Sequence, residues 1–200
     1  MRYNIDIEHL FDIWIGVRAS KEYRFMKSCC FTGHRNIPAE DIVPVKFDLD
    51  ITLRSLIAKG VSAFYCGAAR GFDTIAAETV IHLKKTYPFL KLYLILPCKA
   101  QDMYWNERDK EKFAFLLAHA DDTECLYETY NNRCMYERNK ALVDSADICI
   151  CYLRKKHSGS AFTAALAAKR GLHIIPVGGT GGIESELLSN QLDLESMEFD

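Results

Sequence analysis

Short apolar segments alternate with segments of helical periodicity from Lys27 onward, and this alternation constrains the fold more than any other feature of the chain. The apolar segments are rich in β-branched and aromatic residues and are apolar on both sides, as strands buried in a parallel sheet are. They lie at residues 28–31, 62–65, 92–96, 123–127, 148–153 and 173–177. Helical patterns fill the intervals, at residues 48–59, 73–86, 106–119, 133–145 and 160–170, and Gly60, Pro88 and Gly171 stand where three of them end. The alternation predicts an α/β fold: a Rossmann-like, doubly wound, mainly parallel sheet with helices on both faces, in a single domain.

The length of 200 residues suits one domain with short appendages. Residues 26–180 contain all the predicted strands, residues 1–25 form an N-terminal extension, and residues 181–200 form an acidic C-terminal tail. The extension does not resemble a signal peptide, because charges interrupt its apolar residues and no small-residue cleavage site follows. Its apolar residues recur at helical spacing, which favours an amphipathic helix. The alternative is that Met26 is the natural start and residues 1–25 lie upstream of it.

The charge balance and the cysteines exclude several classes of protein. With 25 Lys and Arg against 27 Asp and Glu, the net charge is −2, so there is no general positive charge for binding nucleic acid. No apolar run reaches the length of about 18 residues that a membrane span needs. The eight cysteines lie mostly in apolar strands and include no Cys-x-x-Cys pair, which favours buried structural thiols over metal or redox sites. We therefore expect a cytoplasmic protein that requires no metal or other cofactor.

The loops that follow the strands are the candidate sites, because ligands bind beyond the carboxyl ends of the strands in an open parallel sheet. The loop after the first strand contains Thr32, Gly33, His34 and Arg35. The glycine permits close approach of a ligand, the arginine suits a phosphate, and the histidine can donate or accept a hydrogen bond near neutral pH. The alternative is an ordinary turn with two solvated polar side chains.

The loop after the second strand opens a helix and contains Gly67, Arg70 and Gly71, followed by Asp73 as the expected N-cap. Small residues at a helix N-terminus let backbone N–H groups approach an anion. The glycine spacing differs from the G-x-G-x-x-G of dinucleotide-binding proteins. A turn that is needed only for tight packing explains the same residues.

Three later segments add polar groups at the same edge of the predicted sheet. Gln101 and Trp105 follow the third strand, and the indole ring either stacks on a base or covers the core. Arg138 and Asn139 lie in a helical segment. The residues Ser158, Gly159 and Ser160 begin the last helix, where a hydroxyl can cap the helix and free N–H groups can hold a phosphate.

Taken in order, these motifs resemble those of the SMF/DprA–LOG (SLOG) superfamily, and specifically its YpsA-like branch. The matching residues are Cys-Cys-Phe-Thr-Gly-His-Arg at 29–35, Gly-Ala-Ala-Arg-Gly-Phe-Asp at 67–73, Gln101 with Trp105, and Arg138 with Asn139. The resemblance covers residues 26–177 and implies a Rossmann-like fold with a site for a nucleotide-derived ligand. In such a site, Arg35 and Arg138 would hold phosphates and Trp105 would stack.

Residues 135–139, Met-Tyr-Glu-Arg-Asn, also resemble the Met-His-x-Arg-Lys motif of LOG-type nucleoside monophosphate phosphoribohydrolases, which split an N-glycosidic bond. The second motif of those enzymes, Pro-Gly-Gly-x-Gly-Thr-x-x-Glu, supplies a Glu that supports the developing oxocarbenium charge. In this chain residues 157–165 stand at that place, and no carboxylate occurs between residues 148 and 183. An N-glycosidase would therefore need displaced chemistry, with His34 as the acid and Asp73, Glu78 or Glu137 as the carboxylate.

The function expected from the sequence is a binding or sensor module for a nucleotide-derived, phosphate-bearing small molecule, without robust catalysis. An N-glycosidase is the alternative. Single-stranded DNA binding of the DprA kind is a minor alternative, because the basic run at 154–156 is short and the chain is slightly acidic. A homo-oligomer is compatible with the sequence, whereas nucleic-acid partners and membrane insertion are not favoured. Residues 148–183 hold five basic residues and no acid, and residues 184–200 hold six acids and no base. The near-neutral total thus hides a division of charge, and the acid-free stretch favours a confined anion site there.

Overall fold

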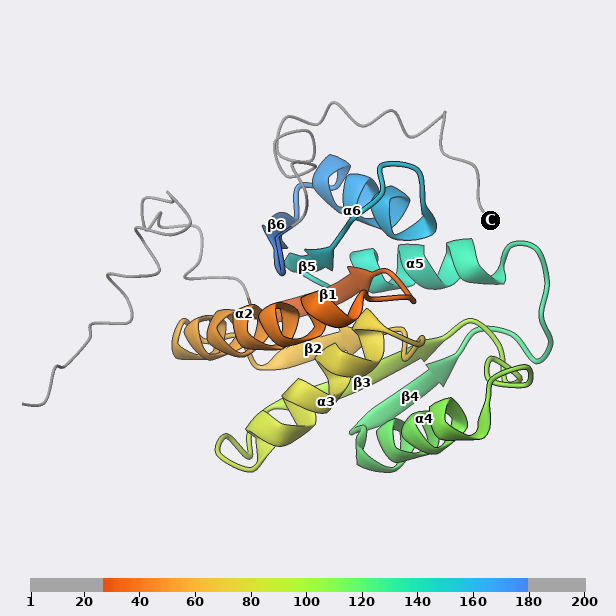
Figure 1. Cartoon of the computed structure of the whole chain (residues 1–200), viewed down its shortest axis with the longest axis horizontal. Coiled ribbons are helices and arrows are strands. Elements are labelled where there is room, and N and C mark those ends of the chain that lie inside the picture. Colours follow the sequence, from red (N-terminus) through yellow and green to blue (C-terminus); the bar gives the residue numbers. More distant parts are fainter. Residues whose placement is uncertain (1–26, 180–200) are drawn as a thin grey trace, which may run out of the picture.

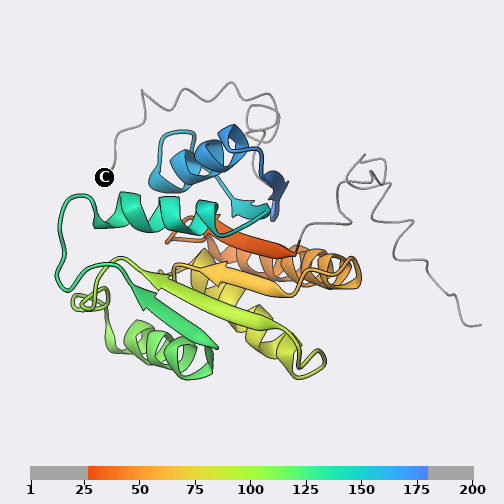
Figure 2. The same ribbon diagram turned by 180° about the vertical axis from the view of Figure 1, so that it is seen from behind.

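The computed structural model describes residues 27–179, which form a six-stranded sheet with helices on both faces (Figures 1 and 2). In chain order the elements are β1 (Ser28–Gly33), α2 (Ala39–Ala58), β2 (Ala63–Cys66), α3 (Phe72–Lys84), β3 (Lys91–Leu96), α4 (Glu107–His119), β4 (Asp122–Cys125), α5 (Cys134–Asp144), β5 (Ile148–Tyr152), α6 (Gly159–Lys169) and β6 (His173–Pro176). Every pair of neighbouring strands is parallel. The predicted fold class is confirmed. The predicted extension at 1–25 and the predicted tail at 181–200 lie outside the described residues.

The strand order is β4-β3-β2-β1-β5-β6, so the direction of winding reverses between β1 and β5. The chain proceeds outward from β1 to β4 and then returns through α5 to the other side of β1. Helices α2, α3 and α4 cover one face of the sheet, and α5 and α6 lie on the other (Figures 1 and 2). At such a reversal the loops after the two central strands diverge to opposite faces and leave a crevice at the carboxyl edge.

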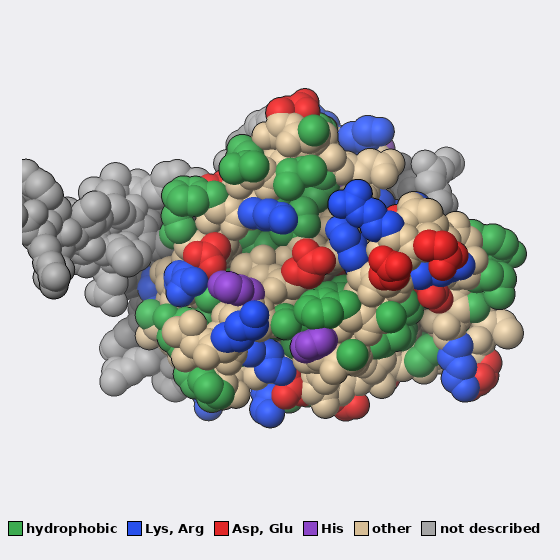
Figure 3. Space-filling model, turned by 60° about the horizontal axis from the view of Figure 1, so that its bottom comes forward, with side chains coloured by type: hydrophobic (Ala, Val, Ile, Leu, Met, Phe, Trp, Pro, Cys, Tyr) green, Lys and Arg blue, Asp and Glu red, His purple; other side chains and the backbone are tan. Residues whose placement is uncertain are grey.

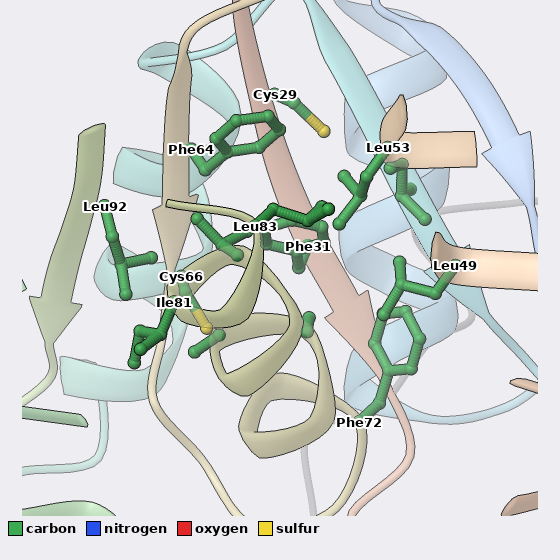
Figure 4. Close-up of a cluster of buried hydrophobic side chains, with 14 of the residues drawn as sticks. Cys29, Phe31, Leu49, Leu53, Phe64, Cys66, Phe72, Ile81, Leu83 and Leu92 are labelled. Carbon is green, nitrogen blue, oxygen red and sulfur yellow. The ribbon is translucent and has the colours of Figure 1, made fainter. Parts of the chain in front are cut away.

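Two apolar cores hold the helices to the sheet. The larger core packs Phe31, Phe64 and Phe72 against the leucines of α2 and α3 (Figure 4). The rings of Phe31 and Phe64 stack with their centroids 6.1 Å apart. The smaller core lies under α5 and α6 and includes three alanines of α6, at positions 161, 164 and 167. Because small side chains let a helix approach a sheet closely, the first turn of α6 lies near the end of β1.

Helix α2 begins at Ala39, whereas the pattern placed its start at residue 48. The difference arises at Pro44, which lies inside the helix although proline lacks the N–H group that an interior position uses. Tertiary contacts sustain the first turns. The hydroxyl of Tyr152 donates to Oδ2 of Asp41 at 2.5 Å, and Nη1 of Arg154 lies 3.2 Å from the same oxygen.

All eight cysteines are free thiols, and all are buried except the half-buried Cys125. This agrees with the prediction that they are small core residues. Burial raises the pKa of the Cys29 and Cys66 thiols well above its usual value, so both remain protonated. Within residues 27–179, no group of His, Cys, Asp and Glu side chains is arranged to hold a metal ion, and no helix is long and apolar enough to cross a membrane.

Candidate functional site

A pocket of about 240 Å³ opens at the carboxyl edge of the sheet, beside the reversal between β1 and β5. Four segments line it: the end of β1 with its loop, the start of α3, one face of α5 and the start of α6. The structure brings together these predicted residues there: Thr32, Gly33, His34, Arg35, Asp73, Arg138, Asn139, Ser158, Gly159 and Ser160. Residues separated by more than a hundred positions in the chain therefore meet in one pocket.

Arg138, on α5, is a buried cation that lines this pocket, with a relative exposure of 5%. Its Nε donates to Oδ1 of Asn139 at 2.8 Å, and its Nη1 donates to the carbonyl oxygen of Gly67 at 2.9 Å. Among the described residues, one carboxylate lies within ion-pair distance, with Oδ2 of Asp73 3.9 Å from Nη1. Burial lowers the pKa of Arg138, and the charge of Asp73 opposes that effect. The positive charge of the guanidinium is thus only partly balanced. Its Nη2 has no hydrogen-bond acceptor within the described part of the protein.

Asp73 is the one acidic residue that lines the pocket, and it is also buried. Burial raises the pKa of its carboxyl group, and the nearby Arg138 and the N–H group of Ala69, 3.3 Å from Oδ2, oppose that rise. The prediction that Asp73 is the N-cap of α3 is wrong, because Gly71 occupies the N-cap position and the helix begins at Phe72. The carboxylate therefore faces the pocket and Arg138 instead of capping its own helix.

His34 joins the loop after β1 to the loop after β5. Its Nε2 accepts hydrogen bonds from the backbone N–H groups of Arg154 at 2.8 Å and Lys155 at 3.2 Å. A ring nitrogen that accepts carries no proton, so the imidazole is neutral with its proton on Nδ1. Burial lowers the pKa of His34, and the charge of Lys155 lowers it further. A role for His34 as general acid stays a prediction.

The free energy of unfolding should fall as the pH drops below the usual His pKa of 6.5. The unfolded chain takes up the His34 proton near that value and the folded protein only below it, so acid favours the unfolded state. Urea unfolding between about pH 8 and pH 5 should show a steeper loss for the wild type than for His34→Gln, whose amide oxygen can still accept hydrogen bonds. Lys155→Ala should give a shallower loss than the wild type. Identical pH dependence in all three proteins would contradict this assignment.

Helix α6 begins at the pocket. Ser158 is its N-cap, and the Ser158 hydroxyl accepts from the N–H group of Ala161 at 3.1 Å, whereas the sequence left the cap open between Ser158 and Ser160. Oγ of Ser160 donates to the carbonyl oxygen of Gly33 at 2.7 Å and joins α6 to β1. The N–H groups of Gly159 and Ser160 have no acceptor among residues 27–179, and the first turn contains no acidic residue. Free N–H groups and the helix dipole make this end of α6 favourable for an anion.

Gly67, Gly71 and Gln101 support the pocket from outside its lining. A Cβ atom on Gly67 would lie 1.9 Å from Nη1 of Arg138, and one on Gly71 would lie 2.2 Å from the carbonyl oxygen of Arg35. Nε2 of Gln101 donates to two carbonyl oxygens of the β2–α3 loop, at 2.9 and 3.3 Å. These residues fix the backbone that positions the lining residues.

The remaining predicted residues, Arg70, Trp105, Glu78 and Glu137, do not line the pocket. The ring of Trp105 packs edge-to-face on Phe113 at 5.5 Å and covers the core, with the Arg70 guanidinium 5.8 Å from its centroid. Glu137 is ion-paired on its own helix at 3.1 Å and lines a different hollow. This geometry does not support base stacking by Trp105 in the pocket or catalysis by the two glutamates.

The sequence reasoning missed the apolar part of the pocket, which includes Met135 and Leu142 on α5. The signal was present in their spacing. Together with Arg138 and Asn139 they stand at i, i+3, i+4 and i+7, which places all four on one face of a helix. The pocket therefore has an apolar side as well as a polar one.

The surface charge is mixed. On the face drawn in Figure 3, basic and acidic side chains are interspersed, with hydrophobic side chains between them. Acidic and basic side chains of the described residues also pair with one another, as Asp121 does with Lys84 at 2.5 Å and with Lys91 at 3.0 Å. The face in Figure 3 thus lacks the continuous basic groove that tracks a nucleic-acid backbone.

A six-stranded parallel sheet with a pocket at its winding reversal, lined by a buried arginine and a helix N-terminus, defines a Rossmann-like protein of the α/β class with a candidate ligand site. The family model YpsA, described as the YspA SLOG family, matches residues 29–175. The chain therefore belongs to the YpsA family of the SLOG superfamily, and the resemblance seen in its motifs is confirmed.

The chain is also similar to curated proteins that carry the name UPF0398. A UPF0398 protein of Bacillus pumilus is 30% identical over 118 residues, which is 58% of this chain and 63% of that protein. A UPF0398 protein of Shouchella clausii is 27% identical over 162 residues, covering 75% of this chain and 85% of that protein. The matches to the first three relatives span between 55% and 66% of those proteins.

Two solved structures share the fold. DNA processing protein A from Helicobacter pylori, described for its single-stranded DNA binding mode, superposes with a TM-score of 0.59 at 18% identity, covering 87% of this chain and 78% of that one. The structural-genomics target TM1055 superposes with a TM-score of 0.52 at 18% identity, covering 82% and 81%. At these identities the likeness concerns the fold alone.

Proposed function

We propose that the pocket binds a nucleotide-derived, phosphate-bearing small molecule, and that the protein is a cytoplasmic binding or sensor module without robust catalysis. One observation carries the proposal: an acid-free helix N-terminus and a buried, incompletely compensated arginine line the same pocket. A phosphate there would accept hydrogen bonds from the N–H groups of Gly159 and Ser160. The phosphate would also supply a negative charge that balances the positive charge of the Arg138 guanidinium.

The acidic groups support binding more than turnover. Hydrolysis of an N-glycosidic bond requires a carboxylate or a general acid close to the reacting sugar and base. Asp73 is the one carboxylate that lines the pocket, and its Oδ2 lies 3.9 Å from Nη1 of Arg138. The negative charge of Asp73 thus interacts with Arg138, the residue that would bind the phosphate. An N-glycosidase that uses Asp73 is the alternative, and the next experiment separates the two.

Nucleoside 5′-monophosphates and diphosphate-bridged dinucleotides should raise the melting temperature of the full chain. A ligand at a hundred times its Kd stabilises the folded state by about 2.7 kcal/mol, which corresponds to roughly 5–10 °C for a domain of this size. The matching nucleosides, which lack phosphate, should produce little shift, and chromatography should recover the nucleotides intact. The absence of any shift would contradict the proposal. Release of free base would establish the N-glycosidase, and a salt-sensitive shift with a single-stranded oligonucleotide alone would indicate DNA binding.

A further inference from the structure

Helix α2 carries a row of exposed apolar side chains on the side that faces away from the sheet. Its core residues Val45 and Leu49 are fully buried. Val43, Phe47 and Ile51 lie on the opposite side and are 74%, 65% and 38% exposed, because residues two positions apart on a helix differ by about 200°. These three side chains stand four positions apart and form one row about 12 Å long.

The row differs from other exposed apolar side chains of the protein. Single exposed apolar residues are ordinary on a soluble protein, whereas larger contiguous patches mark interaction surfaces. Phe115 and Leu117 on α4 are both exposed, but they are two positions apart and point to different sides of that helix. Phe89 and Tyr104 lie outside the helices and strands. The row on α2 is continuous over two helical turns, and such a surface calls for a partner.

The two ends of the row carry opposite charges. Glu40 stands seven positions before Phe47 and Arg54 stands seven positions after it, so both lie on the same side of α2 as the row. Among the described residues, no cation lies within ion-pair distance of Glu40. Arg54 pairs with Asp50 at 2.7 Å, and its side chain is still 41% exposed. An acid, three apolar residues and a base thus follow one another along one exposed line, with Phe47 at its centre.

Such a line is complementary to a second copy of itself. In an antiparallel pair of α2 helices with a two-fold axis at Phe47, Val43 of each copy meets Ile51 of the other, and Glu40 of each copy meets Arg54 of the other. All of these contacts form together, as the interface of a symmetric dimer requires. A parallel pair would instead bring Glu40 to Glu40 and Arg54 to Arg54.

We infer that α2 is the contact surface between two copies of this protein, which form an antiparallel homodimer. The inference does not depend on what the pocket binds. The five side chains on this line are fewer than the roughly 20–30 residues that each partner supplies to a standard interface. Exposed ion pairs add little affinity and mainly set the direction of pairing. The dimer should therefore be weak, with a Kd on the order of 10–100 μM.

Sedimentation velocity of the full chain, over a concentration series that brackets this Kd, tests the inference. The wild type should pass from one copy to two as its concentration rises. Phe47→Glu places two like charges at the two-fold axis and should weaken the dimer at least about tenfold. The matched control is Phe89→Glu, at a phenylalanine that is 56% exposed outside α2, and it should associate as the wild type does. Circular dichroism checks that each variant is folded.

A charge exchange tests the direction of pairing. Glu40→Arg alone and Arg54→Glu alone should each weaken the dimer, because each brings like charges together at both ends of the contact. An equimolar mixture of these two variants should associate more tightly than either variant alone, since both ends then join opposite charges. A contact within one chain cannot reproduce this result.

The remaining outcomes overturn the inference. One is a wild type that sediments as a single copy throughout, and another is a dimer that Phe47→Glu leaves unchanged. A monomeric wild type whose melting temperature falls in Phe47→Glu but not in Phe89→Glu would show that a segment of the same chain covers the row. A mixture of the two charge variants that associates no better than its components would exclude the antiparallel pair.

Discussion

Replacement of Arg138 by methionine is expected to weaken nucleotide binding about 30-fold or more, because loss of one partner from a buried charged contact costs about 2–5 kcal/mol. Arg138 is 5% exposed, and its Nη2 has no acceptor in the described part of the chain. Methionine keeps the length of the side chain and removes the charge. Calorimetric titration of the nucleotide that stabilises the wild type most would measure the loss.

The control for this experiment is Arg133→Met, at the N-cap position of the same helix. The Arg133 side chain is 78% exposed and pairs with Glu137 outside the pocket, and exposed pairs contribute little. This variant should therefore bind as the wild type does. Wild-type affinity in Arg138→Met would show that the phosphate lies elsewhere.

The same substitution should make stability depend on pH in a new way. Without Arg138, the Asp73 carboxylate would be buried with no cation within ion-pair distance among the described residues. Burial already raises the pKa of Asp73, and Arg138 is the first of the groups that oppose the rise. A folded state that holds its proton more tightly than the unfolded chain loses stability as the pH rises. Arg138→Met should thus be least destabilised near pH 4 and most near pH 8, and adding Asp73→Asn should remove most of this difference in urea unfolding.

Most of the fold could be predicted because its signals are local. Each buried strand is a short apolar run, and Gly60 and Gly171, which mark two helix ends, have φ values of 98° and 79°. The start of α2 could not be predicted in this way. Pro44 reads as a helix boundary in the sequence, and what keeps its turn helical includes the contact between Asp41 and Tyr152, 111 positions apart.

The place of the site could be predicted for a topological reason, since the carboxyl ends of parallel strands share one edge of the sheet. The sequence could not predict which of these candidate residues line the pocket and which support it from behind. Gly67 and Asp73 belong to one motif, yet Asp73 lines the pocket and Gly67 makes room behind it for Arg138. The ring of Trp105 covers the core because it packs against Phe113 of α4. Packing contacts of this kind leave no periodic trace in a single sequence.

Replacement of Gly71 by alanine is expected to destabilise the protein by about 2–5 kcal/mol, from backbone strain and overpacking together. Gly71 has φ 78° and ψ −119°, a conformation that glycine adopts far more readily than any L-residue. The new Cβ would lie 2.2 Å from the carbonyl oxygen of Arg35 and 2.5 Å from that of His34. Both are backbone atoms, so no change of rotamer relieves the contact.

The control is Gly171→Ala, which has φ 79° and no atom within 4 Å of the added Cβ. It should cost only about 1–2 kcal/mol, from the left-handed backbone alone. Relief of the contact at Gly71 requires the β1–α2 loop to move, since the N–H group of Phe72 ties that loop to α3 through the carbonyl oxygen of His34 at 3.1 Å. Gly71→Ala should therefore also weaken nucleotide binding, whereas Gly171→Ala should not. Equal loss of unfolding free energy in urea for both variants, with binding retained in both, would show that the loop carrying Arg35 and His34 adapts freely and does not depend on its close approach to α3.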